Sequence, residues 1–296
     1  MSKVIIITGT STGFGEQGAK KLAQKGHTVY ATMRAVDGKN KSAAQGLRDF
    51  ASKESVQLKV LEMDVTSDES VNKAIQQVIA EANRVDVLIN NAGSGWGGPM
   101  ETLQAEQLNQ QFDVNITGVF RCIKAVLPQM RKQKQGLLIN VSTIAARIAM
   151  PGMSAYVASK WGLEGLLESL RLELAPLGIE TVIIQPGPFG TNFLENMQNG
   201  ADESAGADYG HVGEFFAGFV KSFESMVNDP DLPTDPSIVA DDFAKLIDMP
   251  HGARPLRTVS GLDFGVVRTM NDSAEKHRQS FLKEMELAGL DKVSTN

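Results

Sequence analysis

Tyr156 and Lys160 stand four residues apart at the start of an apolar run that predicts a helix. Residues at i and i+4 share a helix face, so the phenol and the ammonium point into the same space. A phenol ordinarily loses its proton near pH 10. A positive charge beside it favours the phenolate, and lowering the pKa by roughly 3 units takes about 4 kcal/mol of differential stabilisation. Such a pair could move a proton to and from an alcohol near neutral pH, although both residue types are also common on exposed helix surfaces.

A glycine-rich turn lies near the N-terminus, between a strand pattern and a helix pattern. The β-branched run at 4–7 predicts a buried strand, and residues 16–25 predict a helix. Between them Gly9, Gly13 and Gly15 have the spacing G-x-x-x-G-x-G. Glycines in this context let backbone N–H groups approach a pyrophosphate, and the helix N-terminus adds partial positive charge. The turn therefore predicts a nucleotide site rather than a simple chain reversal.

The second strand pattern, at 29–32, ends at Met33-Arg34. This position, about 20 residues past the glycines, is where a carboxylate would bind a ribose 2′-OH. Arg34 stands there instead. Because a guanidinium fits a 2′-phosphate, the sequence favours NADP(H) over NAD(H) as the cofactor.

The rest of the chain alternates between strand and helix patterns. Further strands are expected at about 56–62, 85–89, 137–141, 180–184 and 256–259, and helices at about 39–53, 68–83, 103–134 (interrupted near 115–118) and 272–287. This alternation implies right-handed crossovers and a parallel sheet covered on both faces. We therefore expect an α/β fold with a doubly wound, Rossmann-like parallel sheet. It would form one domain over 1–296, with a helical lid at about 192–235 and a C-terminal helix.

Composition excludes several classes of function. The net charge of −6 argues against nucleic acid or an anionic membrane as a partner, because both favour a basic surface. Cys122 is the single cysteine, so no internal disulfide is expected, and the four histidines show no metal-ligand spacing. The chain enters a strand by about residue 4 without a signal-peptide pattern, and no apolar run approaches about 18 residues. We expect a cytoplasmic protein without a metal site.

Several motifs occur together in one order along the chain. They are the glycine turn at 8–15, Asn90-Asn91-Ala92-Gly93, Asn115, Ser142, Tyr156-x-x-x-Lys160, and Pro186-Gly187 with Thr191. In their order and spacing these motifs resemble the short-chain dehydrogenase/reductase family over roughly residues 3–191. The glycine spacing resembles the shorter, single-domain branch of that family.

The resemblance implies a role for each of four residues. Tyr156 would be the general acid or base, and Lys160 would lower its pKa and hold the nicotinamide ribose. Ser142 would hydrogen-bond the substrate oxygen. Asn115 would position a water that links Lys160 to solvent, and the poor helix formers after it, Thr117-Gly118, agree with a local distortion of the helix there.

The resemblance also implies a set of cofactor contacts along the cleft. Asp64 is in addition a helix-cap residue by its sequence pattern. The implied contacts are Ser11 and Arg34 at the 2′-phosphate, Asp64 and Val65 at the adenine, Gly9, Gly13 and Gly15 at the pyrophosphate, Ala92 and Gly93 near the ribose, Tyr156 and Lys160 at the nicotinamide, and Thr191 at the carboxamide, with Asn91, Pro186 and Gly187 also assigned to the cofactor site.

A helical stretch after residue 210 carries an apolar, mostly aromatic stripe near one face. The stripe either packs in the core or forms a lid that excludes water from the nicotinamide end, and the resemblance favours a lid. Trp96, in a glycine-rich segment after the fourth strand, either lines the same pocket or packs on the surface. The stripe residues are Phe215, Phe216, Phe219, Phe223 and Met226.

The helix that begins near Tyr156 is apolar or small nearly all round, which predicts burial on both sides and a homodimer or homotetramer. The first functional hypothesis is an NADP(H)-dependent oxidoreductase that interconverts a secondary alcohol and a ketone or aldehyde, acting on a small molecule that is mostly apolar. The alternative is a catalytically silent NADP(H)-sensing binding protein. A lyase or epimerase is disfavoured by the glycine spacing.

Overall fold

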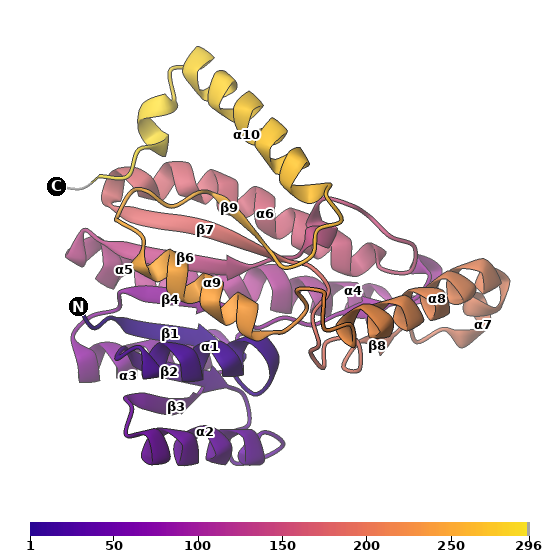
Figure 1. The fold of residues 1–296 in the computed structure, drawn as a ribbon, viewed down its shortest axis with the longest axis horizontal. Helices are drawn as coiled ribbons and strands as arrows, with labels where there is room; N and C mark the ends of the chain where they lie inside the picture. The colour runs from indigo at the N-terminus through magenta and orange to yellow at the C-terminus, as the bar shows by residue number, and fades with distance from the viewer. Residues whose placement is uncertain (295–296) are drawn as a thin grey trace.

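The computed structural model describes residues 1–294, apart from the side chain of Glu203. A parallel sheet of seven strands forms its centre (Figure 1). The strands are β1 (Val4–Thr8), β2 (Thr28–Met33), β3 (Leu58–Glu62), β4 (Val87–Asn90), β6 (Gly136–Val141), β7 (Ile179–Pro186) and β9 (Arg257–Ser260). Their order across the sheet is β3-β2-β1-β4-β6-β7-β9, and every neighbouring pair is parallel. The predicted α/β fold with a Rossmann-like sheet is confirmed.

Helices cover both faces of the sheet. The longer helices are α1 (Gly13–Gln24), α2 (Lys41–Glu54), α3 (Asp68–Ala82), α4 (Ala105–Phe112), α5 (Gly118–Gln133), α6 (Ser154–Leu174), α8 (Gly210–Val227), α9 (Ser237–Asp248) and α10 (Val267–Glu284). Over residues 1–294 none of the helices is both long enough and apolar enough to cross a bilayer.

The β1 strand shows why the sheet is buried on both sides. Side chains alternate between the two faces of a strand, and both faces of a doubly wound sheet need apolar cover. Ile5 and Ile7 pack in one core cluster with residues of α1, α2 and α9. Ile6, between them, packs in a second cluster with residues of α3, α5 and α6. The continuous β-branched run is therefore the sequence signature of a central parallel strand.

The chain reverses its direction of winding at β1, which pairs with β2 on one side and β4 on the other. Ligands of such sheets bind in the crevice at the carboxyl ends of the strands, where the strand order reverses. The loop after β1 carries Gly9, and the loop after β4 carries Asn91. The Asn91 amide donates to the carbonyl oxygens of Thr8 and Gly9, both at 2.9 Å, so the two loops are joined at the crevice.

Some element boundaries differ from those predicted. The long helix expected at 103–134 is two helices joined by a π-helical turn, Asp113–Thr117, where the sequence predicted an interruption. The C-terminal helix α10 begins at Val267, five residues before the predicted start at 272. A short two-stranded sheet joins β5 (Trp96–Gly97) to β8 (Gln198–Asn199), and a one-turn helix, α7 (Glu203–Gly206), precedes α8.

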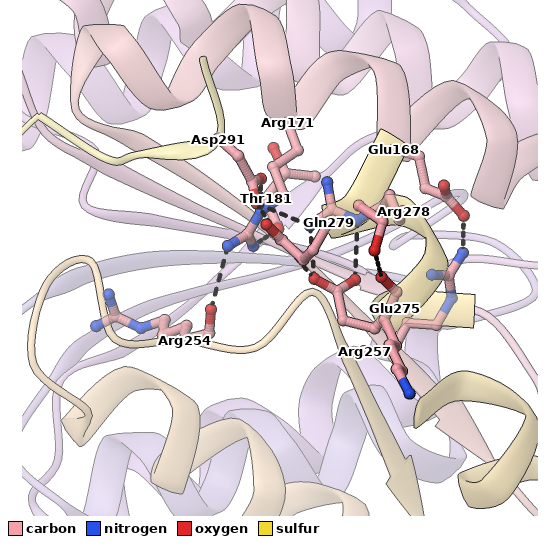
Figure 2. Close-up of polar contacts among 11 residues, drawn as sticks. Glu168, Arg171, Thr181, Arg254, Arg257, Glu275, Arg278, Gln279 and Asp291 are labelled. Atoms are coloured by element: carbon pink, nitrogen blue, oxygen red, sulfur yellow. Dashed lines mark hydrogen bonds and ion pairs between the residues drawn. The ribbon is translucent and has the colours of Figure 1, made fainter. Parts of the chain in front are cut away.

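A network of ion pairs fastens the C-terminal segment to the body of the fold (Figure 2). Asp291, with its side chain 11% exposed, accepts from Arg171 of α6 and from Arg278 of α10, each at 2.8 Å. Arg278 also pairs with Glu275 one turn earlier in α10. The Arg171 guanidinium continues inward and donates to the carbonyl oxygen of Thr181 in β7. The end of the described chain is therefore held by buried charges rather than by apolar packing alone.

Candidate active site

Tyr156 and Lys160 lie on the first two turns of α6, at the carboxyl end of β6. Both are buried, with 7% and 5% of their surface exposed, and both line one large cavity. The Lys160 ammonium donates to the carbonyl oxygen of Val141, the last residue of β6, at 2.9 Å. The helix face predicted from the four-residue spacing therefore faces the crevice at the end of the sheet.

The electrostatics of the pair differ from the expected lowering of the tyrosine pKa. Burial raises the pKa of Tyr156 to about 12, and a hydrogen bond with the Thr143 side chain opposes that rise. Burial lowers the pKa of Lys160 to about 8, and the Glu164 carboxylate opposes that change. Removing both groups from water disfavours both charged forms, and Lys160 is not among the groups that influence the pKa of Tyr156. The expected lowering was wrong for this structure, and Tyr156 is a protonated phenol at neutral pH.

Ser142 and Thr143 both line the cavity, but their side chains have different partners. The Ser142 hydroxyl donates to Glu164 Oε1 at 2.7 Å, and the hydroxyl group bonded to Tyr156 belongs to the next residue, Thr143. Successive side chains at the end of an extended strand point in opposite directions, so the two neighbours cannot both face the tyrosine. The substrate-contact role expected of Ser142 stays a prediction, and Thr143 is a second candidate for it. Two adjacent hydroxyl residues were the available sequence signal, but their types alone do not say which one lies nearer Tyr156.

Asn115 lies in the π-helical turn and is fully buried. Its Oδ1 atom accepts from the Ser94 backbone N–H, and its Nδ2 atom donates to the Ser94 carbonyl and to Ser159 Oγ, all at 3.0 Å. A Cβ atom on Gly93 would lie 3.5 Å from Asn115 Oδ1 and 3.8 Å from Lys160 Nζ, so the two side chains border the same glycine. The predicted helix distortion is present, and the water-positioning role of Asn115 stays a prediction.

The glycine turn forms one wall of the cavity, whose volume is about 690 Å³. Gly9 has φ +68°, and a Cβ atom there would lie 2.7 Å from the Ala92 Cα atom. A Cβ atom on Gly15 would lie 2.4 Å from the Gly9 carbonyl oxygen. Only glycine fits at these two points, where the turn, the start of α1 and the loop after β4 meet. The backbone there is open to a ligand at the N-terminus of α1.

The far end of the cavity carries two cations and one carboxylate. Arg34 and Lys39 both line it, together with Ser11 and Asp64. Burial raises the pKa of Asp64, but hydrogen bonds from Thr66 and the charges of Arg34 and Lys39 outweigh it and leave the pKa lowered. Lys39 was missed in the sequence, where it stands between two strands without a motif.

The remaining predicted cofactor residues lie around the same cavity. Gly15 lies beneath the turn, against Gly9, rather than on the lining. The predicted cofactor residues that line the cavity are Gly9, Ser11, Gly13, Arg34, Asp64, Val65, Asn91, Ala92, Gly93, Tyr156, Lys160, Pro186, Gly187 and Thr191.

Beyond Tyr156 the cavity becomes apolar. Phe193 lies against the tyrosine ring with the ring centroids 5.1 Å apart. The α8 helix lies beyond the carboxyl ends of the strands (Figure 1), and its side chains Phe219, Phe223 and Met226 line the cavity. Phe215, which is 40% exposed, does not line the cavity and stacks on Phe219. Phe216 packs against the buried cluster that contains Tyr156 and Met153. The stripe therefore covers the cavity with three of its five side chains, and one of the others packs in the core.

Trp96 and Cys122 are both buried outside the cavity lining. Trp96 is 8% exposed and pairs through its backbone with Gln198, so it is buried in the small sheet and is not a surface residue. It does not line the large cavity as the described residues define it. Cys122 is fully buried among apolar residues of α5, and burial raises the pKa of its thiol to about 12. Within residues 1–294, no group of three or more His, Cys, Asp or Glu side chains could hold a metal ion.

Comparison with known proteins identifies the family. A family model described as short chain dehydrogenase matches residues 3–202. The 3-ketodihydrosphingosine reductase of Bacteroides thetaiotaomicron is 40% identical over 194 residues, which are 66% of this chain and 66% of that protein. Estradiol 17-beta-dehydrogenase 1 of Rattus norvegicus is 31% identical over 294 residues, covering 96% of this chain and 81% of that protein. A short-chain dehydrogenase from Streptomyces avermitilis has the same fold, with a TM-score of 0.75 at 29% identity over 96% of this chain and 97% of that chain.

The chain belongs to the short-chain dehydrogenase family, whose members are oxidoreductases that act on CH–OH groups. The resemblance stated from the motifs is thereby confirmed. The stretch that matches the bacterial reductase spans just under two thirds of that protein, whereas the match to the estradiol enzyme extends over nearly the whole chain.

Proposed function

We propose that this protein is an NADP(H)-dependent oxidoreductase that interconverts a secondary alcohol and a ketone or aldehyde. The observation that carries the proposal is a single cavity with three chemically different parts. A glycine turn and two cations lie at one end, the Tyr156–Thr143 pair lies in the middle, and an apolar chamber lies at the other end. This arrangement matches a dinucleotide laid along the cleft with its reactive ring facing an apolar substrate.

The residues of the chain supply binding and proton transfer. A nicotinamide bound in this cleft supplies or accepts the hydride. In the reductive direction Tyr156, protonated at neutral pH, donates its proton to the substrate oxygen as the carbonyl carbon becomes saturated. Thr143 donates a hydrogen bond to the same oxygen, where negative charge develops. Lys160, charged below about pH 8, stabilises the phenolate that remains.

The cleft fits the phosphorylated cofactor better than the unphosphorylated one. Arg34 and Lys39 line the end of the cavity that would receive the adenosine ribose, with the Ser11 hydroxyl beside them. The residue after β2 is Arg34, so the carboxylate that would select an unmodified ribose is missing from that position. Two cations and a hydroxyl are suitable donors for a phosphate.

The substrate that we propose is bulky and mostly apolar. The chamber beyond Tyr156 is lined by Phe193, Phe219, Phe223, Met226 and Met153. Two of the relatives are named for 3-ketodihydrosphingosine and for estradiol, which are large molecules with few polar atoms. The lining and these names together support a lipid-like ketone or secondary alcohol.

We also propose that the protein forms a homodimer or homotetramer through α5 and α6. The outer side of α6 exposes small residues and Trp161, which is 50% exposed, and α5 exposes Phe120 at 47%. Apolar side chains on two neighbouring helices are typical of a surface covered by another subunit. Light scattering is expected to give the mass of two or four chains, and a monomer at micromolar concentration would contradict this proposal.

The experiment that tests the function is a screen of ketones, aldehydes and secondary alcohols with NADPH and NADP⁺, followed by the absorbance of the reduced nicotinamide. We expect turnover with large apolar carbonyl compounds. Tyr156→Phe should lower kcat by roughly 10²–10⁴-fold while NADPH still binds. Cofactor binding without turnover across the panel would favour the NADP(H)-sensing alternative, and turnover by Tyr156→Phe at the wild-type rate would contradict the assigned acid.

A further inference from the structure

A buried carboxylate that the proposed reaction does not use lies behind the catalytic pair. Glu164 follows Lys160 by one turn of α6 and is 3% exposed. Its Oε1 atom accepts from Ser142 Oγ at 2.7 Å and from Gln185 Nε2 at 2.8 Å, and its Oε2 atom accepts from Arg257 Nε at 2.8 Å. A buried carboxylate stays ionised when its oxygens are paired with a cation or hydrogen-bonded. Both oxygens of Glu164 meet this condition.

Three successive turns of α6 hold the end of β6. The Lys160 ammonium donates to the carbonyl oxygen of Val141, and Glu164 accepts from the hydroxyl of Ser142. Thr143, two residues past the end of β6, influences the pKa of Tyr156. Ser142 lies between Val141, the contact of Lys160, and Thr143, the residue that influences Tyr156. By holding Ser142, Glu164 therefore fixes the chain segment that carries both of those residues.

Glu164 also opposes the effect of burial on Lys160. Burial lowers the pKa of Lys160 to about 8, and the charge of Glu164 is the influence that raises it. Arg257, on β9, pairs with Glu164. It also pairs with Glu168, one turn further along α6 (Figure 2). Glu164 is the one charged group that influences the pKa of Lys160 within the described residues. The Val141 carbonyl of β6, which accepts from the ammonium, and Gly93 and Asn115 across the crevice carry no charge.

We propose that Glu164 is a positioning residue that acts through Lys160. Its carboxylate supplies the negative charge that keeps the buried ammonium protonated, and it holds the end of β6 at the distance the catalytic groups require. The inference concerns the same site as the proposed function and rests on it for the importance of Lys160. The charge relationship between the two side chains is measurable without turnover.

The test compares the titration of Lys160 in the wild type and in Glu164→Gln, which neutralises the charge and nearly preserves the shape. The protein is labelled with ¹³C-lysine and titrated without nucleotide, and the Lys160 resonance is assigned by its loss in Lys160→Met. The Lys160 midpoint is expected to fall by about one pH unit or more in Glu164→Gln. The alkaline limb of kcat/KM is expected to move in the same direction, and an unchanged midpoint would overturn the inference.

Glu168→Gln is the matched control. It removes the other carboxylate that pairs with Arg257, on the same helix, but its side chain is 36% exposed and it is not among the groups that influence Lys160. Its Lys160 midpoint should stay within a few tenths of a unit of the wild type, since an exposed charge is screened by water. A shift as large as that of Glu164→Gln would remove the specific role from Glu164.

A second variant guards against loss of folding in Glu164→Gln. Arg257→Gln leaves the Glu164 carboxylate in place with less compensating positive charge, so the Lys160 midpoint is expected to rise, opposite to the first variant. No movement, or a fall, would overturn the inference. A wild type that turns over no carbonyl or alcohol would contradict the proposed function alone, because the titrations are read in the protein without cofactor or substrate.

Discussion

The side chain of Thr143 opposes the rise that burial causes in the pKa of Tyr156, and both residues line the cavity. The neighbouring Ser142 hydroxyl donates to Glu164 at 2.7 Å. In the proposed mechanism Thr143 contacts the substrate oxygen, whereas Ser142 joins Glu164 to the end of β6. This division leads to opposite expectations for two substitutions that the sequence alone would treat as equivalent.

Thr143→Ala should lower kcat by roughly 10²-fold or more, because it removes a hydrogen-bond donor from the oxygen on which charge develops. Ser142→Ala should lower kcat by less than about tenfold, since Glu164 keeps two of its three donors. Thr143→Ser keeps the hydroxyl and should retain most of the activity. Steady-state kinetics on a substrate found in the screen give the answer, and a larger loss in Ser142→Ala than in Thr143→Ala would reverse the assignment.

Arg34→Asp should change the cofactor preference. Losing one charge-assisted contact to a 2′-phosphate, and adding a repulsive carboxylate, should weaken kcat/KM for NADPH by roughly 10- to 100-fold, with little loss for NADH. Arg48→Asp, at an exposed position of α2 outside the cavity lining, makes the same charge change and is the control. Equal preference in Arg34→Asp and wild type would count against the assignment of Arg34.

Phe219→Ala and Phe223→Ala should impair the use of large apolar substrates. Each removes apolar surface that lines the chamber, which is worth about 1.5–3 kcal/mol for a buried phenylalanine, so KM should rise by roughly 10-fold or more. Small ketones, which leave the chamber partly empty, should be affected less. Lys221→Ala, at an exposed position of the same helix outside the cavity lining, serves as the control. An equal rise in KM for all three variants would show that the helix as a whole, rather than its inner face, was disturbed.

Carbonyl reduction should lose efficiency as the pH rises through about 8. Burial places the pKa of Lys160 near that value, so the ammonium is present below it and absent above it. Tyr156 stays protonated until about pH 12, so it does not set this limit. The measurement is kcat/KM for NADPH at saturating carbonyl substrate, because this ratio reports the ionisations of the free enzyme. A rate that stays constant well above pH 9 would contradict the role of the ammonium.

Much of the fold was predictable because its signals are local and repeated. The β-branched run at 4–7 and the glycine turn after it identify the first strand and the nucleotide crevice without reference to anything distant. The interruption near 115–118 followed from poor helix formers and is observed as a π-helical turn. The start of α10 was predicted five residues late, because Val267 is buried by tertiary packing that the sequence pattern does not show.

The finer arrangement of the site depended on contacts between distant elements. Lys39 has no motif, and only the closure of the cavity brings it beside Arg34. The direction of the Tyr156 pKa shift could not be read from its spacing to Lys160, because the depth of burial decided it. Likewise the choice between Ser142 and Thr143 depends on Glu164, which lies about twenty residues further along the chain.

The family match stops at residue 202, but the buried charges of the catalytic half are neutralised by residues that come later. Arg257 pairs with Glu164, and Asp291 pairs with Arg171 across 120 positions of sequence. A fragment ending at 202 would keep every nucleotide-binding motif. It would also leave the buried Glu164 carboxylate and Arg171 guanidinium without their ion-pair partners, each at a cost of several kcal/mol. The family model therefore ends before the residues that neutralise buried charges in the part it matches, and the C-terminal third contributes to the stability of the fold as the motifs contribute to its chemistry.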